Sequence, residues 1–195
     1  MSESYRIAVA DDEADMREYF AKILPRLGHE VVSIASTGRE LVEQCRQHHP
    51  DLVVTDIKMP DLDGIEAAVA IYRERPVPVI LVSGYHDAEF VERAEDGHIL
   101  AYLVKPIKQA DLGPAIAIAM RRFGQFESLR QEAAGLRQAL EDRKVVERAK
   151  GILMRRASLD EQEAFRRLQK LASDRNQKLV EVAAAILMAE EAITG

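Results

Sequence analysis

Short apolar runs alternate with longer amphipathic segments through the first 112 residues of this 195-residue chain, and this alternation limits the possible fold more than any other feature. Five runs have the length and composition of buried strands: Arg6–Ala10, Val31–Ala35, Leu52–Thr55, Val77–Val82 and Ala101–Val104. Strands with apolar side chains on both faces, separated by helices, are typical of a parallel sheet that is covered by helices on both sides. The sequence therefore predicts an α/β fold with a five-stranded, doubly wound parallel sheet.

A helical pattern without strand signals begins at Gly113 and continues to the end of the chain. Its first part carries apolar residues at alternating spacings of three and four: Phe126, Leu129, Ala133, Leu136 and Leu140. This stripe predicts a coiled-coil seam of about two heptads, although Gly124 and Gly135 weaken the helix. The alternative is a helix that packs on its own α/β domain.

A small three-helix domain is predicted at the C-terminus, with helices at roughly Lys144–Arg155, Leu159–Leu171 and Lys178–Glu191. Ser158 and Glu161 have the spacing of a capping box, which marks a helix start after a turn. A second break is expected at Ser173–Asn176. The expected domains are 1–122 for the α/β domain, 123–143 for the linker helix, and 144–195 for the helical domain.

The formal net charge of −6 is unevenly distributed, because residues 1–112 carry −9 and residues 113–195 carry +3. A polyanion would therefore bind to the second part. The single cysteine, Cys45, cannot form an internal disulfide, and the N-terminus lacks the basic and apolar regions of a secretory signal. No apolar run approaches the roughly 18 residues of a membrane span. We expect a cytoplasmic protein without a membrane segment.

Polar side chains follow the ends of four predicted strands: Asp11 and Asp12, then Asp56, Ser83 and Lys105. Ligands of such sheets bind beyond the carboxyl ends of the strands, so we expect these side chains to converge. Three clustered carboxylates resist full ionisation unless a cation joins them, and oxygen-only ligands favour a hard cation such as Mg²⁺. A carboxylate beside such a cation can attack a phosphoryl group, because metal and lysine offset the charge of the transferred oxygens.

In these residues the chain closely resembles the response-regulator receiver family, over about residues 5–122. The matching segments occur in the family's order and spacing: Val9–Glu13, Val54–Pro60 with Asp63 and Gly64, Val82–Gly84, and Tyr102–Pro106. The resemblance implies a flavodoxin-like receiver in which Asp56 accepts a phosphoryl group from a sensor histidine kinase. It also implies an Mg²⁺ site formed by Asp11, Asp12, Asp56 and the backbone carbonyl of Lys58.

The same resemblance implies roles for three further residues. Lys105 pairs with the acyl phosphate, Ser83 hydrogen-bonds the phosphoryl oxygens, and Tyr102 rotates inward as Ser83 moves. This rotation would reshape the face formed by the fourth helix, the fifth strand and the fifth helix of the receiver. A cis peptide bond before Pro106 is also implied.

Two other motifs have competing interpretations. The tetrapeptide Asp61–Gly64 could indicate a haloacid-dehalogenase-like phosphatase, but it follows Met59 and Pro60 in a loop whereas Asp56 ends the strand, so a turn is favoured. His48 and His49 are expected at a helix C-terminus, where imidazoles commonly hydrogen-bond exposed carbonyls, and not in a metal site. Cys45 is interpreted as a small helix residue.

The C-terminal segments Val146–Met154, Glu163–Leu168 and Val182–Ile186 resemble the ANTAR family, the antitermination output domain, over about residues 134–191. The resemblance implies a three-helix domain that dimerises and binds paired RNA stem-loops, whose stabilisation disrupts a terminator. A phosphorylated homodimer would then let transcription continue.

Lys144, Arg148, Gly151 and Arg155 form one stripe of the first C-terminal helix. Gly151 could permit close approach of a ligand, or equally of a packed helix. Since Phe165 is the only aromatic residue of 144–195, phosphate contacts should dominate over base stacking. The candidate RNA contacts are Lys144, Arg148, Lys150, Arg155, Arg166, Arg167 and Arg175. Alternatively, these basic residues form a solvated helix face, and some of them only pair with Glu147 or Glu163.

We therefore predict a two-component response regulator that, when phosphorylated, forms a homodimer and binds RNA stem-loops to promote transcription antitermination. One alternative is a helix-turn-helix DNA-binding regulator, since two helices joined by a short turn near Arg175 would look similar in sequence. Another is a receiver whose tail serves only for oligomerisation. Phosphorylation and self-hydrolysis set a switch here and turn over no substrate, so we do not predict an enzyme.

Overall fold

The computed structural model describes residues 3–84 and 99–194. The chain divides after Glu127 into two compact units, an α/β unit and a helical unit. None of the helices in these residues combines the length and the apolar character that crossing a bilayer requires.

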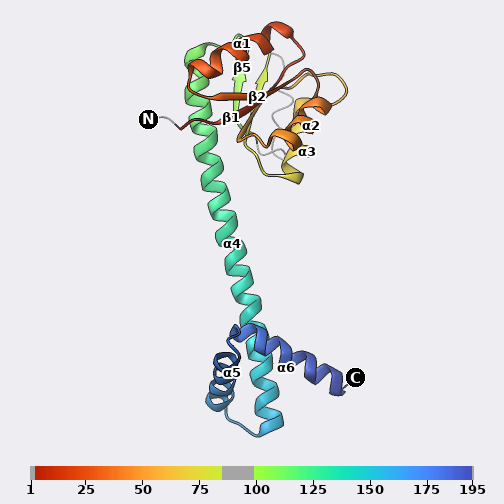
Figure 1. The fold of residues 1–195 in the computed structure, drawn as a ribbon, viewed down its shortest axis with the longest axis vertical. Coiled ribbons are helices and arrows are strands. Elements are labelled where there is room, and N and C mark those ends of the chain that lie inside the picture. Colours follow the sequence, from red (N-terminus) through yellow and green to blue (C-terminus); the bar gives the residue numbers. More distant parts are fainter. Residues whose placement is uncertain (1–2, 85–98, 195) are drawn as a thin grey trace. The chain divides into compact units, whose positions relative to one another are not determined.

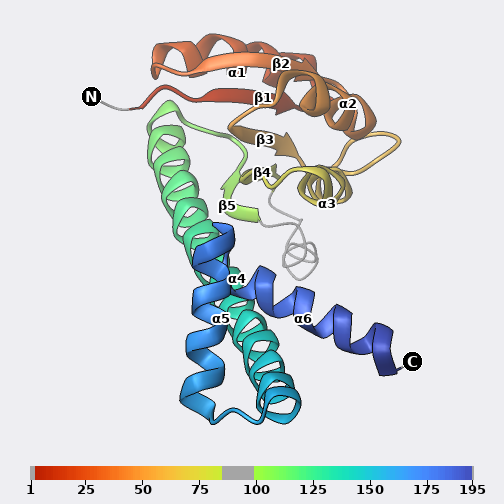
Figure 2. The same ribbon diagram turned by 60° about the horizontal axis from the view of Figure 1, so that its bottom comes forward.

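Five parallel strands form the sheet of the α/β unit, in the order β2-β1-β3-β4-β5 (Figure 2). The strands are β1 (Arg6–Ala10), β2 (Glu30–Ala35), β3 (Leu52–Asp56), β4 (Val79–Ser83) and β5 (Ile99–Val104). All five predicted strands are confirmed, with ends that differ by at most two residues. Strand β4 begins later than predicted because Pro78 has no N–H group for the ladder.

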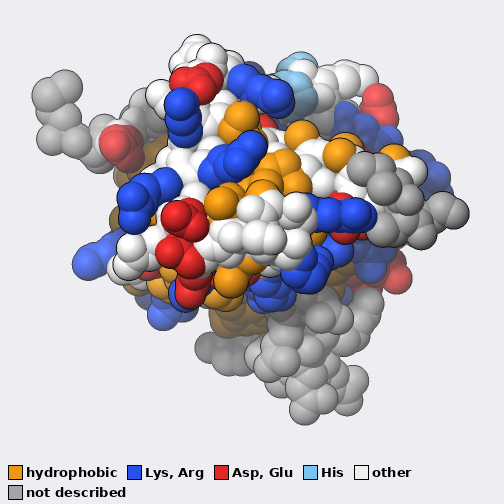
Figure 3. Space-filling model, turned by 90° about the horizontal axis from the view of Figure 1, so that it is seen from below, with side chains coloured by type: hydrophobic (Ala, Val, Ile, Leu, Met, Phe, Trp, Pro, Cys, Tyr) orange, Lys and Arg blue, Asp and Glu red, His pale blue; other side chains and the backbone are white. Residues whose placement is uncertain are grey.

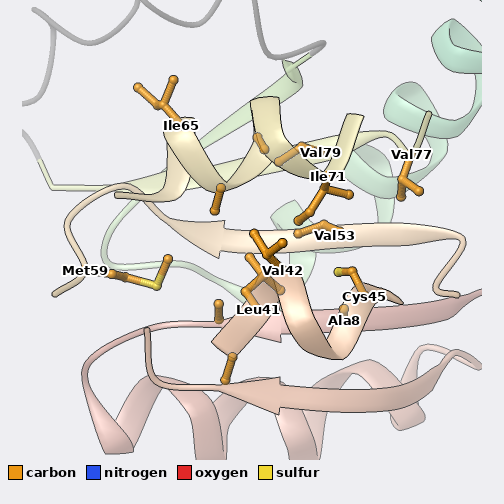
Figure 4. Packing of buried hydrophobic residues seen from close by; sticks show 14 of the residues in the cluster. Ala8, Leu41, Val42, Cys45, Val53, Met59, Ile65, Ile71, Val77 and Val79 are labelled. Carbon is orange, nitrogen blue, oxygen red and sulfur yellow. The ribbon is translucent and has the colours of Figure 1, made fainter. Parts of the chain in front are cut away.

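Helices cover both faces of this sheet, as predicted. Side chains alternate along β1, so that Ala8 and Ala10 belong to one buried cluster and Ile7 and Val9 to the other. The first cluster lies under α2 (Gly38–His48) and α3 (Gly64–Glu74), and the second under α1 (Ala14–Arg26) and the first turns of α4 (Gln109–Ala157). Figure 4 shows Leu41, Val42 and Cys45 of α2 packed toward the strands of the first cluster.

Two interpretations of helix α2 are confirmed. The helix ends at His48, and His49 forms its left-handed C-cap with a φ of 48°. Cys45 is a buried helix residue, and burial raises the pKa of its thiol to about 12, against the opposing charge of Arg75. The thiol is therefore protonated at neutral pH.

The segment Asp61–Gly64 is a turn, as predicted. The side chain of Asp63 accepts a hydrogen bond from the backbone N–H of Glu66, and the Glu66 side chain accepts one from Asp63 N–H, so that both form a capping box for α3. Gly64 lies so close to β3 that an added Cβ would be 1.9 Å from the backbone oxygen of Asp56. The close approach requires glycine at this position.

A single helix, α4, replaces the separate linker helix and first C-terminal helix of the prediction. It runs without interruption from Gln109 to Ala157 and passes through Gly124 and Gly135. Neither glycine breaks it, because the intervening residues are mainly Glu, Gln, Arg, Ala and Leu, which favour helices. The expectation of a separate helix at Lys144–Arg155 was therefore wrong.

The helical unit consists of the C-terminal part of α4 with α5 (Glu161–Arg175) and α6 (Leu179–Thr194) beside it (Figure 1). Its core contains Ala149 of α4, Leu168 of α5 and Ala183 of α6. Helix α5 ends at Arg175, and its C-cap Asn176 adopts a left-handed conformation with a φ of 52°. The predicted break at Ser173–Asn176 is confirmed.

The predicted capping box at Ser158 and Glu161 was wrong. The residue that caps α5 is Asp160, whose side chain accepts from the N–H of Glu163, while the Glu163 side chain accepts from the N–H of Asp160. Ser158 instead adopts a positive φ of 52° in the preceding turn. Both Ser and Asp are good capping residues, so the sequence offered two boxes two residues apart.

We predict that Gly64→Ala destabilises the α/β unit by about 1–3 kcal/mol, because the new methyl group would overlap the backbone oxygen of Asp56. Urea unfolding followed by circular dichroism measures this loss. Gly124→Ala is the matched control, since a Cβ there meets nothing within 4 Å and alanine favours the helix. Equal stability of Gly64→Ala and wild type would contradict the close approach.

Candidate functional site

Three carboxylates meet at the carboxyl edge of the sheet. Asp11 directly follows β1 and Asp56 ends β3, and these strands are neighbours at the point where the strand order reverses. One oxygen of each of Asp11, Asp12 and Asp56 lies within 4.8 Å of the others. The Asp11 side chain is fully buried and Asp56 nearly so, whereas Asp12 is exposed. The predicted convergence of the three acids is thus present.

Lys105 brings a positive charge to this cluster from the end of β5. Its Nζ atom lies 2.8 Å from Oε1 of Glu13, 3.1 Å from Oδ2 of Asp11 and 3.5 Å from Oδ2 of Asp56. The peptide bond between Lys105 and Pro106 is cis, as the receiver resemblance implies. The described fold therefore brings the lysine that follows β5 together with the acids at the ends of β1 and β3.

Burial and mutual repulsion make the carboxylates costly to ionise. Burial, followed by the charge of Asp11, raises the pKa of Asp56 to about 6, and Lys105 acts in the opposite direction. Burial also raises the pKa of Asp11. For Lys105, burial disfavours the charged form, but the hydrogen bond to Glu13 and the charges of Asp11 and Asp56 outweigh it and raise its pKa. The ammonium therefore stays charged.

The donor set fits a hard divalent cation. Oδ2 of Asp11 is buried, and no group among residues 3–84 and 99–194 forms a hydrogen bond of good geometry with it, although the Lys105 ammonium lies nearby. The side-chain donors gathered here are all carboxylate oxygens, one of them exposed, so a cation could keep several waters as Mg²⁺ does. Asp11, Asp12 and Asp56 are the residues that would hold it, and Lys58 follows Asp56 by two residues.

Ser83 and Tyr102 are connected across β4 and β5. The Tyr102 hydroxyl donates a hydrogen bond to the Ser83 hydroxyl, which itself donates to the backbone oxygen of Gly84 at 2.9 Å. Ser83 is fully buried, while Tyr102 is 38% exposed. The two residues implied to act as a switch are therefore in direct contact. The predicted fourth receiver helix lies outside the described residues.

Two residues of this site were not assigned a role from the sequence. Arg17 of α1 donates from Nη1 to the backbone oxygens of Asp11 and Asp12, both at 2.8 Å. Glu13 provides the shortest contact of Lys105 and donates its N–H to Oδ1 of Asp11 at 2.9 Å. The sequence signal was available, because Arg17 lies one helical turn beyond Glu13, the last residue of the matching segment Val9–Glu13.

The candidate RNA contacts of the helical unit are mostly exposed. Lys144 pairs with Glu141 at 2.7 Å, Arg148 lies 3.8 Å from Glu191, and Arg166 donates to Gln162 at 3.3 Å. The remaining exposed ones are Arg155, Arg167 and Arg175. Figure 3, which looks onto the end where α4 passes into α5, shows Lys and Arg side chains spread over this face with hydrophobic side chains exposed between them.

Lys150 differs from the other candidates because its side chain is only 9% exposed. Its ammonium lies 2.9 Å from Glu147 on the same helix and 2.8 Å from Glu161 on α5, and 5.9 Å from the ring centre of Phe165. The hydrogen bonds to Glu161 and Glu147 raise its pKa. These contacts connect α4 to α5 and speak against a direct contact of Lys150 with RNA.

Comparison with known proteins identifies the family. The model of the response regulator receiver domain matches residues 7–117, and that of the ANTAR domain matches residues 134–187. The chain belongs to the response regulators, with a receiver domain followed by an ANTAR domain. Both resemblances stated from the sequence are thereby confirmed.

Individual relatives agree with this assignment. The transcriptional regulatory protein PdtaR of Mycobacterium tuberculosis (strain ATCC 25618 / H37Rv) is 42% identical over 182 residues, which cover 93% of this chain and 89% of PdtaR. A receiver domain protein from Clostridium thermocellum is 31% identical, with a TM-score of 0.57 over 62% of this chain and 98% of its own. A CheY-like receiver from Methanospirillum hungatei is 28% identical, with a TM-score of 0.58 over 63% and 98%.

We predict that Arg17→Lys weakens Mg²⁺ binding by about tenfold, because lysine keeps the charge but cannot reproduce the guanidinium contacts to both carbonyls. Isothermal titration of the protein with Mg²⁺ measures the change. Arg26→Lys, at an exposed position in the last turn of the same helix, is the matched control. An unchanged Mg²⁺ affinity in Arg17→Lys would show that the turn of Asp11 and Asp12 does not depend on Arg17.

Proposed function

We propose that this response regulator is phosphorylated on Asp56 by a sensor histidine kinase and then binds RNA stem-loops, which promotes transcription antitermination. The observation that carries the proposal is the presence, in one chain, of the buried Asp56–Lys105 cluster and an ANTAR domain. The first is suited to receive a phosphoryl group, and the second is named for antitermination. We expect the switch to act in the cytoplasm.

Asp56 is the proposed nucleophile. One of its carboxylate oxygens attacks the phosphorus atom of the phosphohistidine, and the bond between phosphorus and the imidazole nitrogen breaks with its electron pair on the imidazole. Bound Mg²⁺ would supply positive charge near the transferred oxygens. Lys105, already 3.5 Å from Asp56, is placed to pair with the new acyl phosphate. This chemistry sets a state of the protein and turns over no substrate for its own sake.

Release of Lys105 from its carboxylates and movement of Ser83 would couple this step to the rest of the receiver. Ser83 would turn toward the phosphoryl oxygens, which removes the acceptor of the Tyr102 hydroxyl. The 38% exposed Tyr102 could then move inward. Such a switch needs a difference in free energy between the two states of about 1–3 kcal/mol.

RNA binding by the helical unit is proposed to rest on phosphate contacts. The residues proposed to contact RNA are Lys144, Arg148, Arg155, Arg166, Arg167 and Arg175, which are all exposed. For Lys150 we propose a positioning role between α4 and α5, given its contacts with Glu147 and Glu161. Phosphate contacts of this kind make affinity fall with salt, with a log-log slope of about 0.7–0.9 per contact.

We predict that Asp56→Asn abolishes labelling by a small acyl-phosphate donor, because the amide is not a nucleophile, and with it the gain in RNA affinity. Labelling and the dissociation constant of a synthetic RNA with two stem-loops are measured with and without the donor. Asp51→Asn, a partly exposed residue before β3, is the control. Normal labelling of Asp56→Asn would overturn the acceptor assignment.

The same binding assay separates the competing functions of the helical unit. Duplex DNA of equal length that displaced the stem-loop RNA would favour a helix-turn-helix DNA-binding regulator. Failure of the phosphorylated protein to bind either nucleic acid would favour a tail that serves only for oligomerisation.

We further propose a phosphorylation-dependent homodimer formed along α4. Leu129, Leu136 and Leu140 are 65%, 62% and 59% exposed, and with Phe126 and Ala133 they lie on one stripe of the helix. Exposed leucines at this spacing are suited to a coiled coil with a second copy. Burial of these side chains would stabilise the dimer by removing apolar surface from water.

We predict that phosphorylation strengthens dimerisation by about 5- to 150-fold, and that Leu129→Lys with Leu136→Lys prevents it without affecting Asp56 labelling, since two charges would enter the seam. Sedimentation velocity gives the mass of each species. Ser128→Lys with Gln131→Lys adds the same charge away from the seam and is the control. Dimerisation of the leucine variant at wild-type strength would exclude this seam.

A further inference from the structure

A groove of about 480 Å³ separates α4 and α6 in the helical unit. Arg148, Gly151 and Arg155 of α4 line one side, and Glu190 and Glu191 of α6 line the other. The proposed basic stripe of α4 therefore faces carboxylates across the groove. Acidic residues beside a surface that is proposed to bind a polyanion require an explanation.

Two arginines of α4 are already paired with these carboxylates. Nε of Arg156 donates to both carboxylate oxygens of Glu190, at 3.1 and 3.2 Å. Nη2 of Arg148 lies 3.8 Å from Oε1 of Glu191, which is longer than a hydrogen bond, and both side chains are about two-thirds exposed. An exposed ion pair such as Arg148–Glu191 contributes little to stability, so a phosphate group could replace this carboxylate. In the other pair Arg156 is 53% exposed, so a phosphate group can also reach its guanidinium.

Arg155 completes the basic edge of the groove. Among the described residues, no carboxylate is found within salt-bridge distance of it. Its Nη1 atom lies 3.5 Å from the position that a Cβ on Gly151 would take, an ordinary contact distance, so this guanidinium lies back along the helix beside Gly151. Arg148 and Arg155 thus line the groove, and Arg156 adjoins it through its pair with Glu190. Carboxylates of α6 pair with Arg148 and Arg156.

We propose that Glu190 and Glu191 compete with RNA phosphates for Arg156 and Arg148, so that the end of α6 sets how tightly the helical unit binds any polyanion. RNA that takes up these arginines brings its own negative charge close to the carboxylates of Glu190 and Glu191, which lowers affinity. Because the competition concerns phosphate contacts, it acts on affinity and leaves sequence preference unchanged. This inference rests on the proposed RNA-binding function.

The test compares Glu190→Gln and Glu191→Gln with wild type in the full-length protein. We expect each variant to bind a two-stem-loop RNA and an RNA of scrambled sequence about two- to fivefold more tightly, the effect of one exposed ion pair. Both variants should also elute from heparin at higher salt. Asp174→Asn removes one negative charge from an exposed position of α5 and should leave both measurements near wild type.

A double-mutant cycle identifies the arginine involved. The gain from Glu191→Gln should disappear in an Arg148→Met background, because no guanidinium is left for the carboxylate to release. Glu190 is only 21% exposed, so its variant is checked by thermal unfolding. If Glu190→Gln loosens α6, the exposed Glu191 and Arg148 carry the test.

Three results would overturn the competition: unchanged affinity of Glu191→Gln, a gain that persists with Arg148→Met, or an equal gain from Asp174→Asn. A wild-type protein that binds heparin but no RNA would instead contradict the proposed function. In that case the heparin measurements still decide whether Glu190 and Glu191 compete with polyanions.

Discussion

The contact of the Lys105 ammonium with the carboxylates of Asp11, Glu13 and Asp56 is the interaction on which the rest of the receiver edge depends. Asp11 and Asp56 are buried close together, so burial and repulsion both oppose their ionisation. Lys105, which follows the edge strand β5, offsets part of the free-energy cost of ionising these two carboxyl groups. It also provides a partner for the negative charge that the proposed phosphorylation would add to Asp56.

Helix α4 provides the physical connection between the two units. Its first turns contribute Leu112 and Ile116 to the core of the α/β unit, and its last turns contribute Ala149 to the core of the helical unit. Because α4 contributes side chains to both cores, a change in how its first turns pack on the sheet acts on a helix that the core of the helical unit also needs. Leu129, Leu136 and Leu140 lie between these two ends and are exposed, and they form the surface on which the proposed second chain would pack.

Local patterns predicted those features that depend on few neighbours. The strands followed from apolar runs, and the acidic edge followed from the rule that parallel strands end at one side of a sheet. Prediction failed where two local signals were equivalent, because Ser158 and Asp160 could each cap a helix. It also failed in α4, where the helix propensity of the surrounding residues outweighed the weakening effect of Gly135. It also grouped Lys150 with its exposed neighbours, because helical spacing does not show that α5 covers one side of α4.

The sequence by itself determined the α/β class, the order of its strands and helices along the chain, and the identity of the residues at the strand ends, since these follow from periodicity and residue chemistry. Only the tertiary structure decided which side chains meet. It placed Arg17 on the carbonyls of Asp11 and Asp12, and paired Arg148 with Glu191. Such contacts join residues of different elements, and their distances depend on how helices and strands pack in space, which no local pattern of residues records.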